Sequence, residues 1–99
     1  MTPIHRETMT LTTSSGSASG NTVPSIQGIL RQVIASPATS STTYNITITN
    51  ADSRIIYKRT SETGDLAENV QIPIKRINTV ALSSATADEL FNIELVIEQ

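Results

Sequence analysis

Apolar and polar residues alternate along most of the chain after residue 25, and this period of two predicts β-strands. The clearest alternation covers residues 43–49, which read T-Y-N-I-T-I-T. Residues 50–53 (N-A-D-S) are typical of a turn, and residues 54–60 follow it as a return strand. These two segments therefore predict a β-hairpin.

Other segments share this strand character. Residues 26–35 are apolar on both faces, which predicts a central strand, and Pro37 ends it because proline cannot donate to a ladder. Pro73 lies between two isoleucines and predicts an edge strand or a bulge. The predicted strands after residue 25 are 26–35, 43–49, 54–60, 70–74, 77–83 and 91–97.

This pattern defines the fold class. The strands recur at a spacing of roughly ten residues, and β-branched residues dominate them. A short helix could start in residues 86–91, but the alternation that follows Phe91 is too regular for one. We therefore predict an all-β antiparallel sandwich, either jelly-roll or immunoglobulin-like, of six to seven strands.

The first 25 residues differ from the rest. Residues 12–22 (T-T-S-S-G-S-A-S-G-N-T) offer almost no apolar surface to offset the entropy of ordering them. We predict a flexible Ser/Thr/Gly-rich arm over residues 1–25 and a sandwich domain over residues 26–99, so that deleting residues 1–24 would leave the fold intact. The arm could add a strand to a neighbouring sheet, and its predicted partner-binding residues are Met9, Thr10, Leu11 and Thr12.

Composition excludes several classes of protein. The chain has no Cys, one His and three aromatic residues, so a disulfide framework and a thiolate metal site are impossible. No segment is long and apolar enough for a membrane span, and the first residues lack the pattern of a signal peptide. The net charge of −2 predicts no binding to nucleic acid or to an anionic membrane.

The charge is unevenly distributed along the sequence. Residues 1–61 carry five basic and two acidic side chains, whereas residues 62–99 carry two basic and seven acidic ones. Copies of such a chain could meet head to tail, although both halves could equally be solvated surface. The candidate residues for charge contacts between subunits are Arg54, Lys58, Arg59, Lys75, Arg76, Glu94 and Glu98.

Catalytic and metal-binding motifs are absent from the sequence. His5 and Glu7 would share a strand face but are too few to hold a metal ion. The acidic segments 50–52 and 62–65 could bind Ca²⁺ only if the fold brought them together. We therefore expect no enzyme activity, no catalytic residue and no cofactor. Tyr44 and Tyr57 are predicted to be core or sheet cover, but side by side on the surface they could stack on sugars.

The chain combines a Ser/Thr/Gly-rich arm with a sandwich whose final part, residues 77–95, reads I-N-T-V-A-L-S-S-A-T-A-D-E-L-F-N-I-E-L. In this combination it resembles small virion structural proteins of tailed bacteriophages. The resemblance implies a capsid decoration (cement) protein that binds the lattice of the major capsid protein through its arm and sheet edges. It further implies a homo-oligomer, with a trimer favoured, in a virion assembled in the host cytoplasm. No functional residue follows from it.

Two alternatives remain open. Neck and tail proteins of the same virions share the small size, the lack of Cys and the β-structure. A carbohydrate-binding β-sandwich module would instead use the loops around Tyr44, Tyr57 and the acidic turns. The small number of aromatic residues argues against a sugar site of the stacking type.

Overall fold

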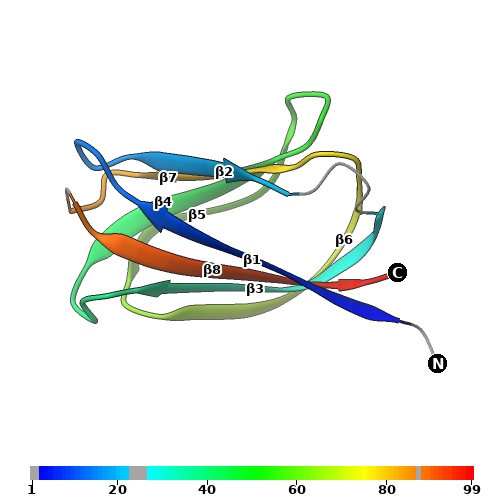
Figure 1. Cartoon of the computed structure of the whole chain (residues 1–99), viewed down its shortest axis with the longest axis horizontal. Coiled ribbons are helices and arrows are strands. Elements are labelled where there is room, and N and C mark those ends of the chain that lie inside the picture. The colour runs from blue at the N-terminus through cyan, green and yellow to red at the C-terminus, as the bar shows by residue number, and fades with distance from the viewer. Residues whose placement is uncertain (1–2, 23–26, 87) are drawn as a thin grey trace.

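The computed structural model describes residues 3–22, 27–86 and 88–99. These residues form two four-stranded antiparallel sheets packed face to face (Figure 1). The strands are β1 (Ile4–Thr12), β2 (Ala18–Asn21), β3 (Gln27–Pro37), β4 (Thr43–Thr49), β5 (Ile55–Thr63), β6 (Leu66–Lys75), β7 (Thr79–Ser83) and β8 (Leu90–Glu98).

The strand order identifies a jelly roll. One sheet has the order β1-β8-β3-β6 and the other has the order β2-β7-β4-β5, so the chain crosses repeatedly between the two layers. The predicted all-β sandwich is confirmed, and of the two predicted forms the jelly roll is correct. The strand count is eight rather than six or seven, and the described residues contain no helix.

The prediction of a flexible N-terminal arm is wrong for the residues that the structure describes. Residues 4–12 pair with β8 along their whole length, and residues 18–21 pair with β7. Each segment completes one edge of a sheet, and backbone hydrogen bonds to the neighbouring strand order it despite its polar composition. The sandwich therefore includes residues on both sides of the expected boundary at residue 25, while residues 1–2 and 23–26 lie outside the described part.

The predicted partner-binding residues of the arm lie in this first strand. Met9, Thr10, Leu11 and Thr12 pair in register with Ile93, Asn92, Phe91 and Leu90 of the same chain. Leu11 is part of the core, and Met9 packs against it. Binding to another protein remains a prediction for this segment, and only the open edge of β1 is available for backbone pairing with a partner.

The core lies between the two sheets, where the alternating apolar residues of each strand meet. All four residues predicted to face inward from the last strand are buried: Phe91, Ile93, Leu95 and Ile97. The Tyr44 ring from β4 meets the Phe91 ring edge to face, with centroids 5.0 Å apart and planes at 75°. This contact joins the two sheets near the starts of β4 and β8.

Both tyrosines are core residues, as expected, and neither offers a surface for sugar stacking. Tyr44 is fully buried and its hydroxyl donates to the Gly64 carbonyl at 2.8 Å. Tyr57 is 7% exposed and donates to Glu68 Oε1 at 2.6 Å. Burial raises the pKa of both phenols, and the pKa of Tyr44 rises to about 12.

The predicted hairpin and edge strand are confirmed, but the edge strand β6 covers residues 66–75 rather than the predicted 70–74. β4 and β5 pair as predicted, and β6, which contains Pro73, lies at the edge of its sheet. The predicted turn over residues 61–65 is shorter, because β5 continues to Thr63 and β6 begins at Leu66. Between these strands Gly64 adopts a φ of +73°, which a glycine accommodates without steric cost.

Candidate binding groove at one end of the sandwich

A groove of about 410 Å³ lies at the end of the sandwich where β6 finishes and β3 begins. We call this end of the molecule the groove end. Its lining side chains come from the start of β3, the turn between β4 and β5, and the end of β6 with the residue that follows. The lining residues are Gln27, Gly28, Ile29, Asn50, Ala51, Asp52, Pro73, Ile74, Lys75 and Arg76.

The pairing of β3 with β6 builds the floor of the groove. Gln27 lies opposite Lys75 and Ile29 lies opposite Pro73, which places apolar side chains beside amide and ammonium groups. Gly28 lies between them with a φ of +151°, and a Cβ at this position would stand 2.3 Å from the Glu98 carbonyl oxygen. Only glycine lets the end of β8 approach the groove this closely.

A hydrogen-bonded turn forms one wall of the groove. Asn50 Oδ1 accepts from the backbone N–H groups of Asp52 and Arg54, each at 3.0 Å. Ser53 takes the left-handed conformation that closes the turn, with a φ of +63°. The Asn50 side chain is therefore committed to holding the turn, whereas the exposed Asp52 carboxylate accepts no hydrogen bond from the part of the chain that the structure describes.

The opposite wall follows the end of β6. Arg76 has a φ of +60°, an uncommon conformation for a residue with a long side chain. The loop is held by Asn78, which is 1% exposed: its Nδ2 donates to the Arg76 carbonyl at 3.2 Å and its backbone N–H donates to Thr22 Oγ1 at 2.9 Å. These bonds fix the backbone from which Arg76 reaches the groove.

Three of the predicted inter-subunit charges are instead paired within the chain. Glu94 accepts from Arg6 at 2.8 Å, and Glu98 accepts from Arg31 Nε at 2.8 Å. Arg59 Nε donates to Glu68 Oε1 at 2.8 Å, across the open side between β5 and β6. The pairing register of the strands brings the first two pairs together, so Arg59, Glu94 and Glu98 have nearby partners before any subunit arrives.

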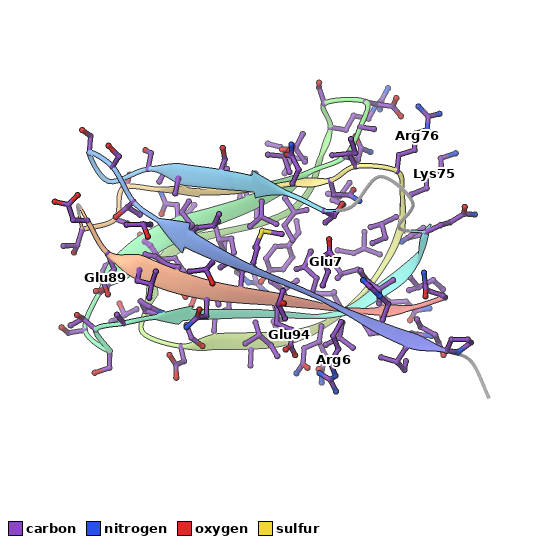
Figure 2. The ribbon with its side chains drawn as sticks, viewed as in Figure 1. Arg6, Glu7, Lys75, Arg76, Glu89 and Glu94 are labelled. Carbon is purple, nitrogen blue, oxygen red and sulfur yellow. The ribbon has the colours of Figure 1, made fainter. Side chains whose placement is uncertain are left out.

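The other four predicted charges behave differently. Arg54, Lys58, Lys75 and Arg76 are exposed, and they form no ion pair with the residues that the structure describes. Lys75 and Arg76 line the groove, and Figure 2 shows both at one end of the long axis. They stay available to a ligand or to another chain.

The remaining candidates from the sequence do not form a site. His5 Nε2 and Glu7 Oε1 lie 3.0 Å apart on one strand face, as expected. The segments 50–52 and 62–65 stand at opposite ends of the β4–β5 hairpin, so they do not form a joint Ca²⁺ site. Within the described residues no cluster of His, Cys, Asp and Glu could hold a metal ion, and no helix has the length and apolar character to cross a membrane.

A second concavity, of about 450 Å³, lies on the outer face of the β1-β8-β3 sheet. Met9, Thr10 and Glu94, which the sequence predicted to bind partners, are among its lining residues. Its surface is open, and Glu94 is engaged by Arg6 beside it (Figure 2). It offers fewer available charged groups than the groove, which we take as the main candidate site.

The sequence alone did not single out Gln27 or the groove that it shares with Asp52, Lys75 and Arg76. It included Asp52 only in the acidic turn 50–52, and it named Lys75 and Arg76 only as charges for contacts between subunits. Gln27 and Lys75 are distant in the sequence and meet only through the pairing of β3 with β6. The turn composition of residues 50–53 correctly predicted one wall of the groove, and the acidic turns were among the loops expected for a sugar site, but neither signal predicted the neighbours of the turn.

Comparison with known proteins supports the fold. No family model matches the sequence, and no curated protein matches it. Among solved structures, PirA is similar with a TM-score of 0.53 and 11% identity, over 90% of this chain and 93% of PirA. The C-terminal CBM6 of LamC, a marine laminarinase from Zobellia galactanivorans, has a TM-score of 0.50 and 7% identity, over 97% of this chain and all of that one. At these identities the likeness concerns the β-sandwich fold.

Proposed function

We propose that the protein is a non-catalytic carbohydrate-binding β-sandwich module that binds its ligand in the groove. The observation that carries this proposal is the convergence of Gln27, Asp52, Lys75 and Arg76 from three separate segments above an apolar floor. A concave site with a few convergent polar groups on an apolar lining is the usual arrangement of a small-molecule site.

The chemistry of the lining suits a sugar. Hydroxyl groups both donate and accept, so a carboxylate, an amide and basic groups can each bind one. The apolar side chains of Ile29 and Pro73 can cover the C–H face of a sugar ring. Because the three aromatic side chains are all buried, recognition in this groove would rest on hydrogen bonds rather than on stacking.

The likeness to the LamC module is consistent with this proposal, since that protein is named as a carbohydrate-binding module of family 6. The alignment spans 97% of this chain and 100% of that one, so the likeness extends over nearly the whole of both sequences. The likeness supports a binding role for such a fold, and the groove supplies the local chemistry.

Binding to a glycan array followed by titration of the best oligosaccharide tests the proposal. We expect saturable binding, and we expect Gln27→Ala and Asp52→Ala each to weaken it by about tenfold, because each removes a hydrogen bond worth about 1–3 kcal/mol. The matched control is Asn69→Ala, an exposed amide on β6 outside the groove, which should bind as the parent does. A parent chain that binds no glycan, or a double variant that binds normally, would contradict the proposal.

A second candidate is the virion structural protein that the sequence resembles, either a capsid decoration protein or a neck or tail protein. The observation in its favour is the nine-residue strand β1 at an open sheet edge, where a neighbouring strand could be added. Attachment would use this edge rather than a free arm, because residues 4–12 already pair with β8.

Co-sedimentation with shells of the major capsid protein tests this second candidate. We expect the chain to pellet with the shells, and we expect Thr8→Pro on β1 to reduce the pelleted fraction more than Thr60→Ala on β5. A parent chain that stays in the supernatant at saturating shell concentration would count against a decoration role.

A further inference from the structure

The two ends of the sandwich carry opposite charge. At the groove end, Arg54, Lys75 and Arg76 outnumber Asp52, which leaves a net side-chain charge of +2. The opposite end is formed by residues 13–17, 38–42, 64–65 and the connection from β7 to β8, tied together by backbone hydrogen bonds such as Gly64 N–H to the Thr42 carbonyl. Its acidic residues are Glu62, Asp65, Asp88 and Glu89, a net charge of −4 with no basic residue among the described ones. Glu89 is buried and its carboxylate accepts from the Thr39 N–H at 2.7 Å, so Glu62, Asp65 and Asp88 are the groups that can meet a neighbour.

Ion pairs within the chain increase this separation of charge between the two ends. Arg6, Arg31 and Arg59 are neutralised by acidic side chains in the body of the sandwich. The basic residues that remain unpaired within the described part of the chain are Arg54, Lys58, Lys75 and Arg76, and three of these four lie at the groove end. Figure 2 shows the result along the 38 Å axis, with Lys75 and Arg76 at one end and Glu89 at the other.

Exposed apolar side chains stand beside these charges. Ile55 at the start of β5 is 59% exposed, and Ile77 after β6 is 38% exposed, both at the groove end. Leu90, at the start of β8, is 41% exposed at the opposite end. An apolar centre with a charged rim is the usual composition of a protein–protein contact.

We propose that copies of this chain associate head to tail, with the basic groove end of one copy against the acidic end of the next. Arg54, Lys75 and Arg76 would face Glu62, Asp65 and Asp88 of the neighbour. The two surfaces differ, so an open assembly always has one free basic end and one free acidic end, to which further copies can add. Such contacts build an open filament or a closed ring.

The size of the ends sets the strength of the contact. The two shorter extents of the molecule are 26 and 19 Å, so an end covers roughly 500 Å² per partner, below the about 800 Å² of a standard stable interface. The association is therefore weak and strongly dependent on salt, since exposed charges are screened beyond a Debye length of about 8 Å at physiological ionic strength.

Sedimentation velocity of the full chain at increasing concentration tests the proposal. In about 20 mM salt we expect the average mass to rise above the 10.6 kDa of one chain, and in about 500 mM salt we expect the association to weaken by at least about tenfold. A chain that stays monomeric in low salt at millimolar concentration, or one whose association ignores salt, would overturn the proposal.

Charge-swapped variants give the decisive control. Arg54→Glu with Lys75→Glu makes the groove end acidic, and Glu62→Lys with Asp65→Lys removes the negative charge of the opposite end. Each double variant alone should lose self-association. An equimolar mixture of the two should form pairs, because the unchanged basic groove end of the second variant then meets the unchanged acidic end of the first. Lys58→Glu, in the middle of β5, should associate as the parent does.

Two further outcomes would decide against this arrangement. Failure of the mixture to recover, with both variants folded by circular dichroism, would overturn the head-to-tail contact. A limiting mass of two chains for the parent would indicate a closed symmetric dimer and would also overturn it. Lys75 also lines the groove, so the groove-end variant changes the candidate glycan site as well. Self-association is measured without glycan, and Gln27→Ala, which should weaken glycan binding, should associate as the parent does, so the two proposals can fail separately.

Discussion

Deletion of residues 1–22 is expected to abolish cooperative folding of this protein. The deletion removes β1 from β8 and β2 from β7, so that both sheets lose an edge strand at once. It also removes Leu11 from the core, and it removes Thr13, whose Oγ1 accepts from the Glu89 N–H at 2.9 Å and donates to the Thr86 carbonyl at 2.5 Å. The free energy of unfolding of a domain of this size is only about 5–15 kcal/mol, which is small compared with these losses.

Far-ultraviolet circular dichroism with urea unfolding, together with the dispersion of amide NMR signals, measures this effect. We expect the truncated chain to show no cooperative transition and poorly dispersed signals. Thr8→Ala, which changes an exposed side chain of β1 and leaves its backbone pairing, should alter the free energy of unfolding by no more than about 0.5 kcal/mol. A truncated chain that unfolds cooperatively at the parent's urea midpoint would show that β1 and β2 are dispensable.

Stability is expected to fall steeply between about pH 10 and pH 12, chiefly because of Tyr44. Burial, followed by the negative charges of Glu62 and Asp65, raises the pKa of Tyr44 from 10.0 to about 12 in the folded protein. The unfolded chain releases this proton near pH 10, so the stabilisation is fully present below that pH and disappears as the pH approaches 12. Two pKa units correspond to about 3 kcal/mol in the free energy of unfolding.

Urea unfolding of the parent and of Tyr44→Phe from about pH 7 to pH 12 measures this contribution. At neutral pH the variant should be about 1–2 kcal/mol less stable, because the Gly64 carbonyl loses its hydrogen bond. Above about pH 10 its stability should decline less than that of the parent. Tyr57→Phe is the matched control and should keep most of the alkaline loss. Equal alkaline slopes for the parent and Tyr44→Phe would refute this assignment.

The period-two pattern predicted the strands whose inner faces fill the core. Residues 43–49 form β4, and the central position of β3 followed from its apolar residues on both faces. Pro73 correctly marked an edge strand. These predictions succeeded because side-chain burial decides the structure of such segments, and burial is visible in the sequence as alternation.

The Ser/Thr/Gly-rich segment could not be predicted in the same way. β2 is ordered because its backbone pairs with β7 and because Gly20 packs closely against Leu11 and Met9. A Cβ at Gly20 would lie 2.8 Å from Leu11 Cδ2. Neither effect leaves an apolar pattern in the sequence. A polar edge strand therefore looks the same as a flexible linker until its partner strand is known.

The candidate site depends even more than the fold on which strands pair and in which register. Gln27 and Lys75 meet in the groove because of the register between β3 and β6, which a single sequence does not specify. The same holds for the charges: Arg31 binds Glu98 through the β3–β8 register, whereas Lys75 finds no acidic side chain to pair with among the described residues. Composition predicted a separation of charge, and strand register decided which charges remain on the surface.

The pairing of β1 with β8 also constrains the order in which the molecule can be assembled. Arg6 and Glu94 are 88 positions apart, and both must be present before their two strands can join. A chain emerging from the ribosome therefore holds its first strand unpaired until nearly the whole domain has been synthesised. Because closing so long a loop is entropically costly, we expect this jelly roll to fold late in synthesis and slowly compared with a helical bundle of equal length.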